Sequence, residues 1–79
     1  KEHSMRTTET TDWGLMLSTQ KSQRVMYKFG TGQISVSDAT KALANSKYSG
    51  AFRKLVRTHG ALYARRLTRK ALRYRGILS

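Results

Sequence analysis

Lysine and arginine dominate the second half of this 79-residue chain, where no residue is acidic. Between Ala39 and Ser79 the sequence holds seven arginines and four lysines but no Asp or Glu. The planar guanidinium of arginine binds phosphate through two parallel hydrogen bonds and stacks on bases, so this composition favours contact with a nucleic-acid backbone. The eleven basic residues are Lys41, Lys47, Arg53, Lys54, Arg57, Arg65, Arg66, Arg69, Lys70, Arg73 and Arg75.

This strip carries almost all of the net charge of +12, because residues 1–12 sum to −1 and residues 13–38 to +2. Like charges at helical spacing repel one another, and surfaces that serve only solubility normally mix both signs. We therefore expect an anionic polymer as partner, with a merely solvated surface and an anionic membrane surface as alternatives. RNA is slightly preferred over DNA, because Arg-rich segments order on binding RNA.

Aromatic residues interleave with the basic ones, and such residues can stack on unpaired bases. Phe52, Tyr63 and Tyr74 are expected in the core because they share one helical stripe, whereas Tyr48 falls in a predicted loop and is the stacking candidate. The residues predicted to bind nucleic acid are therefore Arg53, Lys54, Arg57, Arg65, Arg66, Arg69, Lys70, Arg73, Arg75 and Tyr48.

The elements that must position these residues begin after a polar arm. Residues 1–11 lack hydrophobic periodicity and are predicted to be a flexible arm, followed by one small domain over residues 12–79. Residues 12–29 favour an interrupted helix that ends before Gly30 as its C′ residue. An alternative α+β fold would place a hairpin at residues 24–37, with Gly30-Thr31-Gly32 as its loop.

Two further helices follow. Ser35 and Asp38 have the spacing of a capping box, which predicts a short helix over residues 36–44. A third, long helix is expected to start at a cap, Ser46 or Ser49, and to stop at Gly76. Its inward stripe is predicted to contain Phe52, Val56, Tyr63, Leu67, Ala71, Tyr74 and Leu78.

The expected fold class is thus all-α: a bundle of about three helices with a long basic amphipathic C-terminal helix. A chain of this length buries only about 60 per cent of its unfolded surface, and it has no Cys to form disulfides. We therefore expect its stability to depend in part on the partner.

Catalysis is not expected. Of the residues able to act as bases near neutral pH, His3 lies in the predicted arm and His59 near the inward stripe. The four acids, Glu2, Glu9, Asp12 and Asp38, form no paired set, so no cofactor, metal site or small-molecule substrate is predicted. No run of about 20 apolar residues spans a membrane, and an intracellular or particle-bound location is expected.

These observations predict a non-enzymatic protein that contacts phosphates, most simply as a component of a ribosome or another large RNA particle. A genome-packaging or coat protein that self-assembles is the main alternative. A helix-turn-helix regulator, with Arg53, Lys54 and Arg57 in the major groove, and a membrane-surface amphipathic protein are further alternatives. The expected partners are nucleic acid and either other proteins of an assembly or further copies of this chain.

Overall fold

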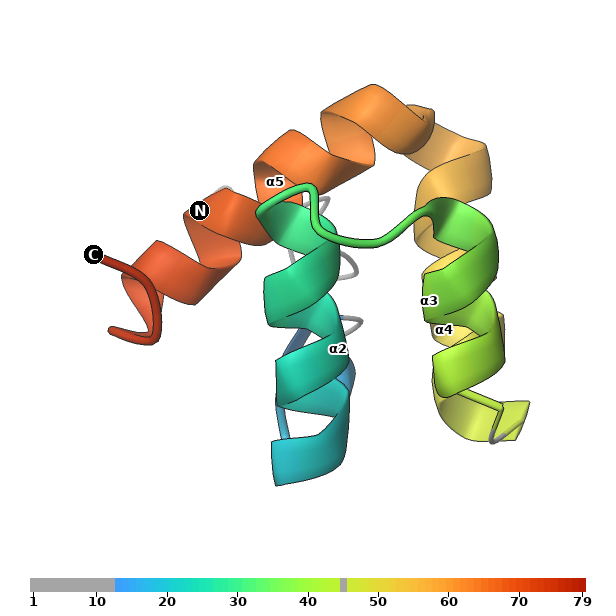
Figure 1. Cartoon of the computed structure of the whole chain (residues 1–79), viewed down its shortest axis with the longest axis horizontal. Helices are drawn as coiled ribbons and strands as arrows, with labels where there is room; N and C mark the ends of the chain where they lie inside the picture. Colours follow the sequence, from blue (N-terminus) through green and yellow to red (C-terminus); the bar gives the residue numbers. More distant parts are fainter. Residues whose placement is uncertain (1–12, 45) are drawn as a thin grey trace, which may run out of the picture.

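The computed structural model describes residues 13–44 and 46–79, and these residues form helices and no strand (Figure 1). A helical turn at residues 13–16 precedes α2 (Gln20–Gly30), α3 (Val36–Ala42), α4 (Ser46–His59) and α5 (Ala61–Tyr74). The all-α expectation is confirmed. The alternative hairpin at residues 24–37 is wrong, because α2 covers residues 24–30 and α3 begins at Val36. The predicted arm, residues 1–11, lies outside the described residues.

Two helices begin at hydroxyl caps that the local sequence supplies. The Oγ1 of Thr19 accepts a hydrogen bond from the amide of Ser22 at 3.2 Å and caps α2. The Oγ of Ser35 accepts one from the amide of Asp38 at 3.1 Å and caps α3, as the S-x-x-D spacing predicts. Each cap satisfies an amide that has no partner inside the helix.

Glycines with positive φ end two of the helices. After α2, Gly32 has a φ of 83°. Its amide bonds to the carbonyl of Phe29, and the amide of Gln33 bonds to that of Lys28, which together form a Schellman motif. The left-handed residue is therefore Gly32, and the prediction that placed Gly30 at C′ is wrong. Gly76, with a φ of 77°, ends α5 in the same way, as predicted.

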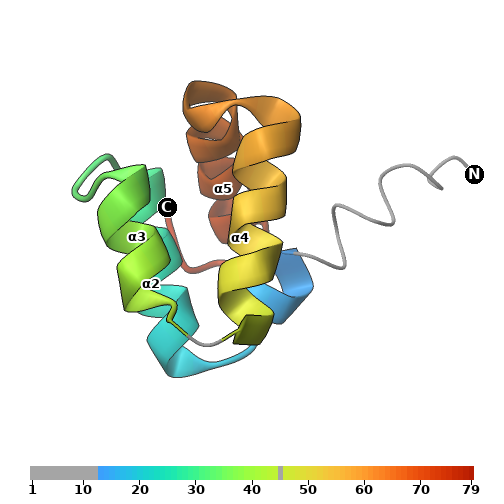
Figure 2. The same ribbon diagram turned by 90° about the vertical axis from the view of Figure 1, so that its right-hand side faces the viewer.

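The predicted long C-terminal helix is two helices, because Gly60 breaks it. Gly60 has a φ of 85°, which a residue with a β-carbon rarely adopts, and it forms the N-cap of α5. The chain turns there, so α5 leads away from α4 and passes over the end of α2 (Figures 1 and 2). The basic C-terminal segment was predicted as one continuous helix and instead forms two helices that point in different directions.

The core is formed where the turn at residues 13–16 and the helices α2, α3, α4 and α5 meet. Phe29 and Phe52 pack edge to face with ring centroids 4.9 Å apart. The buried face of α5 consists of Ala64, Thr68 and Leu72, with Leu67 and Ala71 partly buried beside it. The predicted stripe is correct for Phe52, and its members Val56, Leu67, Ala71 and Leu78 are partly buried against the core, but it is wrong for Tyr63 and Tyr74, which are exposed. The break at Gly60 shifts the phase of the pattern, so a stripe extended from α4 wrongly includes these two residues of α5.

Gly30 allows α2 and α5 to approach closely. A Cβ added at this position would lie 3.1 Å from Cγ2 of Thr68 and 3.3 Å from Cδ1 of Leu72. Both neighbours are fully buried, so they have little room to move. The glycine therefore belongs to the helix interface and not to the turn that follows it.

We expect Gly30→Ala to lower the free energy of unfolding by about 1–3 kcal/mol, because overpacking a filled interface strains it. Gly50→Ala is the matched control: Gly50 also lies in a helix, but nothing stands within 4 Å of its added Cβ. That change should raise the free energy of unfolding by about 0.5–1 kcal/mol through helix propensity. Urea unfolding followed by circular dichroism measures both, and equal effects at the two sites would contradict the close packing of Gly30.

Candidate nucleic-acid interface

Two of the arginines predicted to bind phosphate are hydrogen-bonded within the protein. Nη1 of Arg65 donates to the carbonyl oxygens of Phe29 at 2.7 Å and Ile34 at 3.0 Å. The guanidinium carbon also lies 4.4 Å from the centroid of the Phe29 ring, in the range of a cation–π contact. Nη1 of Arg69 donates to the carbonyl of Gly30 at 2.9 Å.

These bonds place two positive charges at the C-terminus of α2. The last carbonyls of a helix lack partners in the helix and carry the negative end of its dipole, so cations stabilise that end. Arg65 and Arg69 are both partly buried. Their first role is thus to join α5 to α2, which sequence spacing cannot reveal because the partner carbonyls are 31 to 39 positions away.

The other predicted cations point outward. Arg66, Lys70 and Arg73 follow one another along the exposed face of α5 at steps of four and three residues. Arg53, Lys54 and Arg57 are exposed on α4. Arg75 is exposed just beyond α5, with its Nη2 close enough to the turn at residues 13–16 that a Cβ on Gly14 would lie 3.6 Å away. The exposed set is therefore Arg53, Lys54, Arg57, Arg66, Lys70, Arg73 and Arg75.

The aromatic residues are placed differently from the prediction. Tyr48 lies in the first turns of α4, where it is partly buried and packs on the core, so it is not in a loop. Tyr63 and Tyr74 are the exposed tyrosines of the described residues, and both lie on α5 beside the outward cations. Ala64, Thr68 and Leu72 follow one another at steps of four. This spacing indicates a buried face of α5 from which both tyrosines are excluded, so it would have predicted their exposure.

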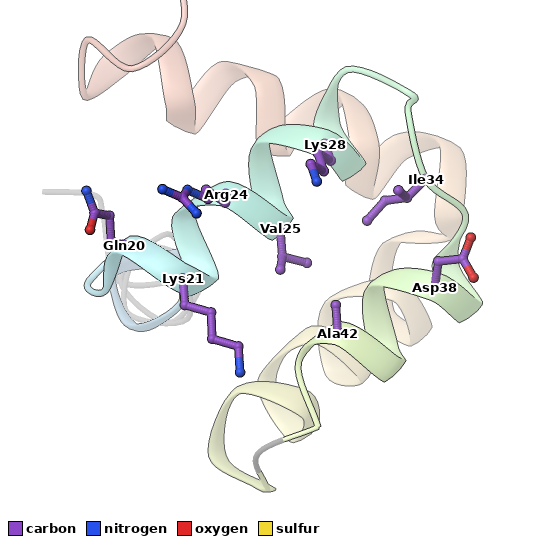
Figure 3. A pocket seen from close by; sticks show the side chains of 8 residues that line it. All are labelled: Gln20, Lys21, Arg24, Val25, Lys28, Ile34, Asp38 and Ala42. Atoms are coloured by element: carbon purple, nitrogen blue, oxygen red, sulfur yellow. The ribbon is translucent and has the colours of Figure 1, made fainter.

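Sequence reasoning gave little weight to a second basic row on α2. Lys21, Arg24 and Lys28 follow one another at steps of three and four and line a groove of about 660 Å³ between α2 and α3 (Figure 3). Asp38 stands on the α3 side of the same groove. Because an acid is part of its lining, this groove is less suited to phosphate than the acid-free surface of α5.

Groups that could support other functions are sparse in the described residues. His59 contacts two rings, that of Trp13 at 6.1 Å and that of Tyr63 at 5.7 Å between centroids. Within residues 13–44 and 46–79 no three His, Cys, Asp or Glu side chains gather as metal ligands would. None of the helices seen there has both the length and the apolar character that crossing a membrane requires. His3 lies outside the described residues.

The candidate site is therefore an exposed, acid-free surface of α4 and α5, from which Arg65 and Arg69 are withdrawn. Comparisons of this chain with protein-family models, curated proteins and solved structures find no match.

Proposed function

We propose that this chain is a non-enzymatic structural protein that binds the phosphate backbone of a nucleic acid through the outward faces of α4 and α5. The observation that carries the proposal is the set of seven exposed cations of this surface, in a segment without any acid. Coulomb attraction from such a surface depends on phosphates and not on base sequence. Binding is therefore tight at low salt and largely indifferent to sequence.

A large RNA particle is the preferred setting, over a self-assembling packaging protein. Packaging requires an apolar surface through which copies associate, and the sequence offers the cluster around Trp13 as a candidate for it. Trp13 is buried in the chain's own core, and its Nε1 donates to Oγ1 of Thr68 at 3.2 Å. The cluster around Trp13 is thus buried in the fold of one chain and cannot join two copies. This favours a protein that binds nucleic acid as a single copy among the other components of a particle.

The other two alternatives have less support. In a helix-turn-helix the two helices cross at a wide angle of about 90–120°, whereas α3 and α4 run side by side in opposite directions (Figures 1 and 2). An amphipathic helix on a membrane inserts its apolar face into lipid. The apolar residues Ala64 and Leu72 of α5 are instead buried in the chain's own core.

Removing one outward cation tests the proposal. Arg66→Ala should weaken binding to labelled duplexes of unrelated sequence by a similar factor and reduce the slope of log affinity against log salt by about one. Lys21→Ala is the matched control, because Lys21 is also exposed but lies on α2 in the groove that contains Asp38. It should change the slope much less. Equal slopes for Arg66→Ala and the unmodified chain would overturn the assignment of α5 as the phosphate-binding face.

A further inference from the structure

The large apolar side chains that the described residues leave exposed are all on α5. Leu62 is 81% exposed, Tyr63 49% and Tyr74 92%. Most other large apolar side chains of residues 13–44 and 46–79 are buried in the core or pack partly against it. Exposed aromatic rings concentrated on one helix indicate a surface that contacts something else.

The two tyrosines share one ridge of α5 with two cations. Tyr63, Arg66, Lys70 and Tyr74 follow one another at steps of three, four and four, which places them on the same side of the helix. The second ring lies eleven positions after the first, which corresponds to about 16 Å along the axis. The ridge thus has a ring at each end and two positive charges between them.

Tyr63 is held in place before any ligand arrives. Its ring packs edge to face on His59 at 5.7 Å, and the His59 ring lies 6.1 Å from that of buried Trp13. A side chain fixed in this way loses less conformational entropy when a ligand covers it.

This alternation matches a single strand better than a duplex. In a duplex the base faces are stacked on each other, so an aromatic ring on a helix surface cannot stack on them. A single strand offers phosphates and free base faces in turn, and stacking on aromatic rings is the sequence-tolerant way to bind them. Neither α4 nor α5 has an acidic side chain that would repel the backbone.

We infer that the outward ridge of α5 binds single-stranded nucleic acid, with unpaired bases stacked on Tyr63 and Tyr74 and phosphates bound by Arg66 and Lys70. This inference rests on the proposed function and narrows its ligand. The two rings supply a preference for unpaired over paired strands that the charges alone do not provide.

Fluorescence anisotropy with a labelled uridine oligonucleotide of about 20 nucleotides, and with a labelled duplex of equal length, tests the inference. Tyr74→Ala should weaken binding to the single strand by about 5- to 150-fold, the range of one lost stacking contact, and leave duplex binding unchanged. Tyr63→Ala should do the same. Tyr74→Phe should retain the affinity, because the ring and not the hydroxyl does the stacking.

Leu62→Ala is the matched control, since Leu62 is similarly exposed on the same helix but has no ring. It should have little effect on either ligand. Because Tyr74 is almost wholly exposed, its removal leaves the core intact, which circular dichroism verifies. This variant therefore remains informative even if Tyr63→Ala does not fold.

Three results would overturn the inference while the proposed function stands. They are unchanged single-strand binding in Tyr74→Ala, an equal loss on the duplex, and a native dimer that Tyr74→Ala converts to monomer without loss of single-strand affinity. The last would make a second copy of the chain the occupant of the ridge. Absence of binding to both ligands at low salt, with or without binding to anionic vesicles, would overturn the proposed function as well.

Discussion

Arg65→Ala is expected to lower the free energy of unfolding by about 3 kcal/mol. The change removes charge-assisted hydrogen bonds to two carbonyls, each worth roughly 1.5–3 kcal/mol, and a cation–π contact of about 0.5–2 kcal/mol, in part replaced by water. A domain of this size has a total stability of roughly 4–12 kcal/mol, so the loss is a large fraction of it. Urea unfolding followed by circular dichroism measures the effect.

The neighbouring residue provides the control. Arg66→Ala removes the same side chain from an exposed position, and it should change the free energy of unfolding by no more than about 0.5 kcal/mol. The two variants should therefore differ: Arg65→Ala lowers the free energy of unfolding, whereas Arg66→Ala lowers the affinity for nucleic acid. Unchanged stability in Arg65→Ala, together with a loss of affinity equal to that of Arg66→Ala, would mean that Arg65 binds phosphate instead of α2.

Raising the salt concentration from 50 to 200 mM should weaken nucleic-acid binding by roughly 10³- to 10⁴-fold. Counterions released from phosphates set this dependence, with a slope of about −0.9 per contact on duplex DNA and about −0.7 on a single strand. If the seven exposed cations each neutralise one phosphate, the slopes are about −6 and about −5. A salt titration of affinity for both ligands measures them.

The slope also distinguishes the structural arginines from the surface ones. Counting Arg65 and Arg69 as phosphate ligands would give nine contacts and a duplex slope of about −8. A duplex slope near about −6 is expected if Arg65 and Arg69 bind the carbonyls of α2 and do not bind phosphate. A flat response would contradict electrostatic binding of a polyanion altogether.

Local sequence signals predicted the fold class and several helix ends. Ser35 with Asp38 fixed the start of α3, and Gly76 the end of α5, because capping is decided by residues a few positions apart. Gly60 was harder to interpret. A glycine inside a helical pattern is often tolerated, and only its positive φ makes it the boundary between α4 and α5.

The site was predicted in composition but not in arrangement. The spacing of Arg65 and Arg69 is that of a surface row, yet both donate to carbonyls of α2 or of the loop that follows it, which only tertiary packing brings to them. A hydrophobic stripe that continues from α4 through Gly60 without a change of phase wrongly places Tyr63 and Tyr74 in the core. Long-range contacts and one backbone angle therefore decide which residues of α5 face outward.

The carbonyl dipoles at the C-terminus of α2 partly compensate the positive charge of α5, the most basic of the described helices. Six of the eleven residues from Arg65 to Arg75 carry positive charge, and two of the six, Arg65 and Arg69, donate hydrogen bonds to the carbonyls of Phe29, Gly30 and Ile34. Part of the repulsion that a polyanion would relieve is thus relieved by the chain. Although the sequence predicts a domain whose stability depends in part on its partner, the carbonyls at the end of α2 already stabilise two of its arginines without that partner.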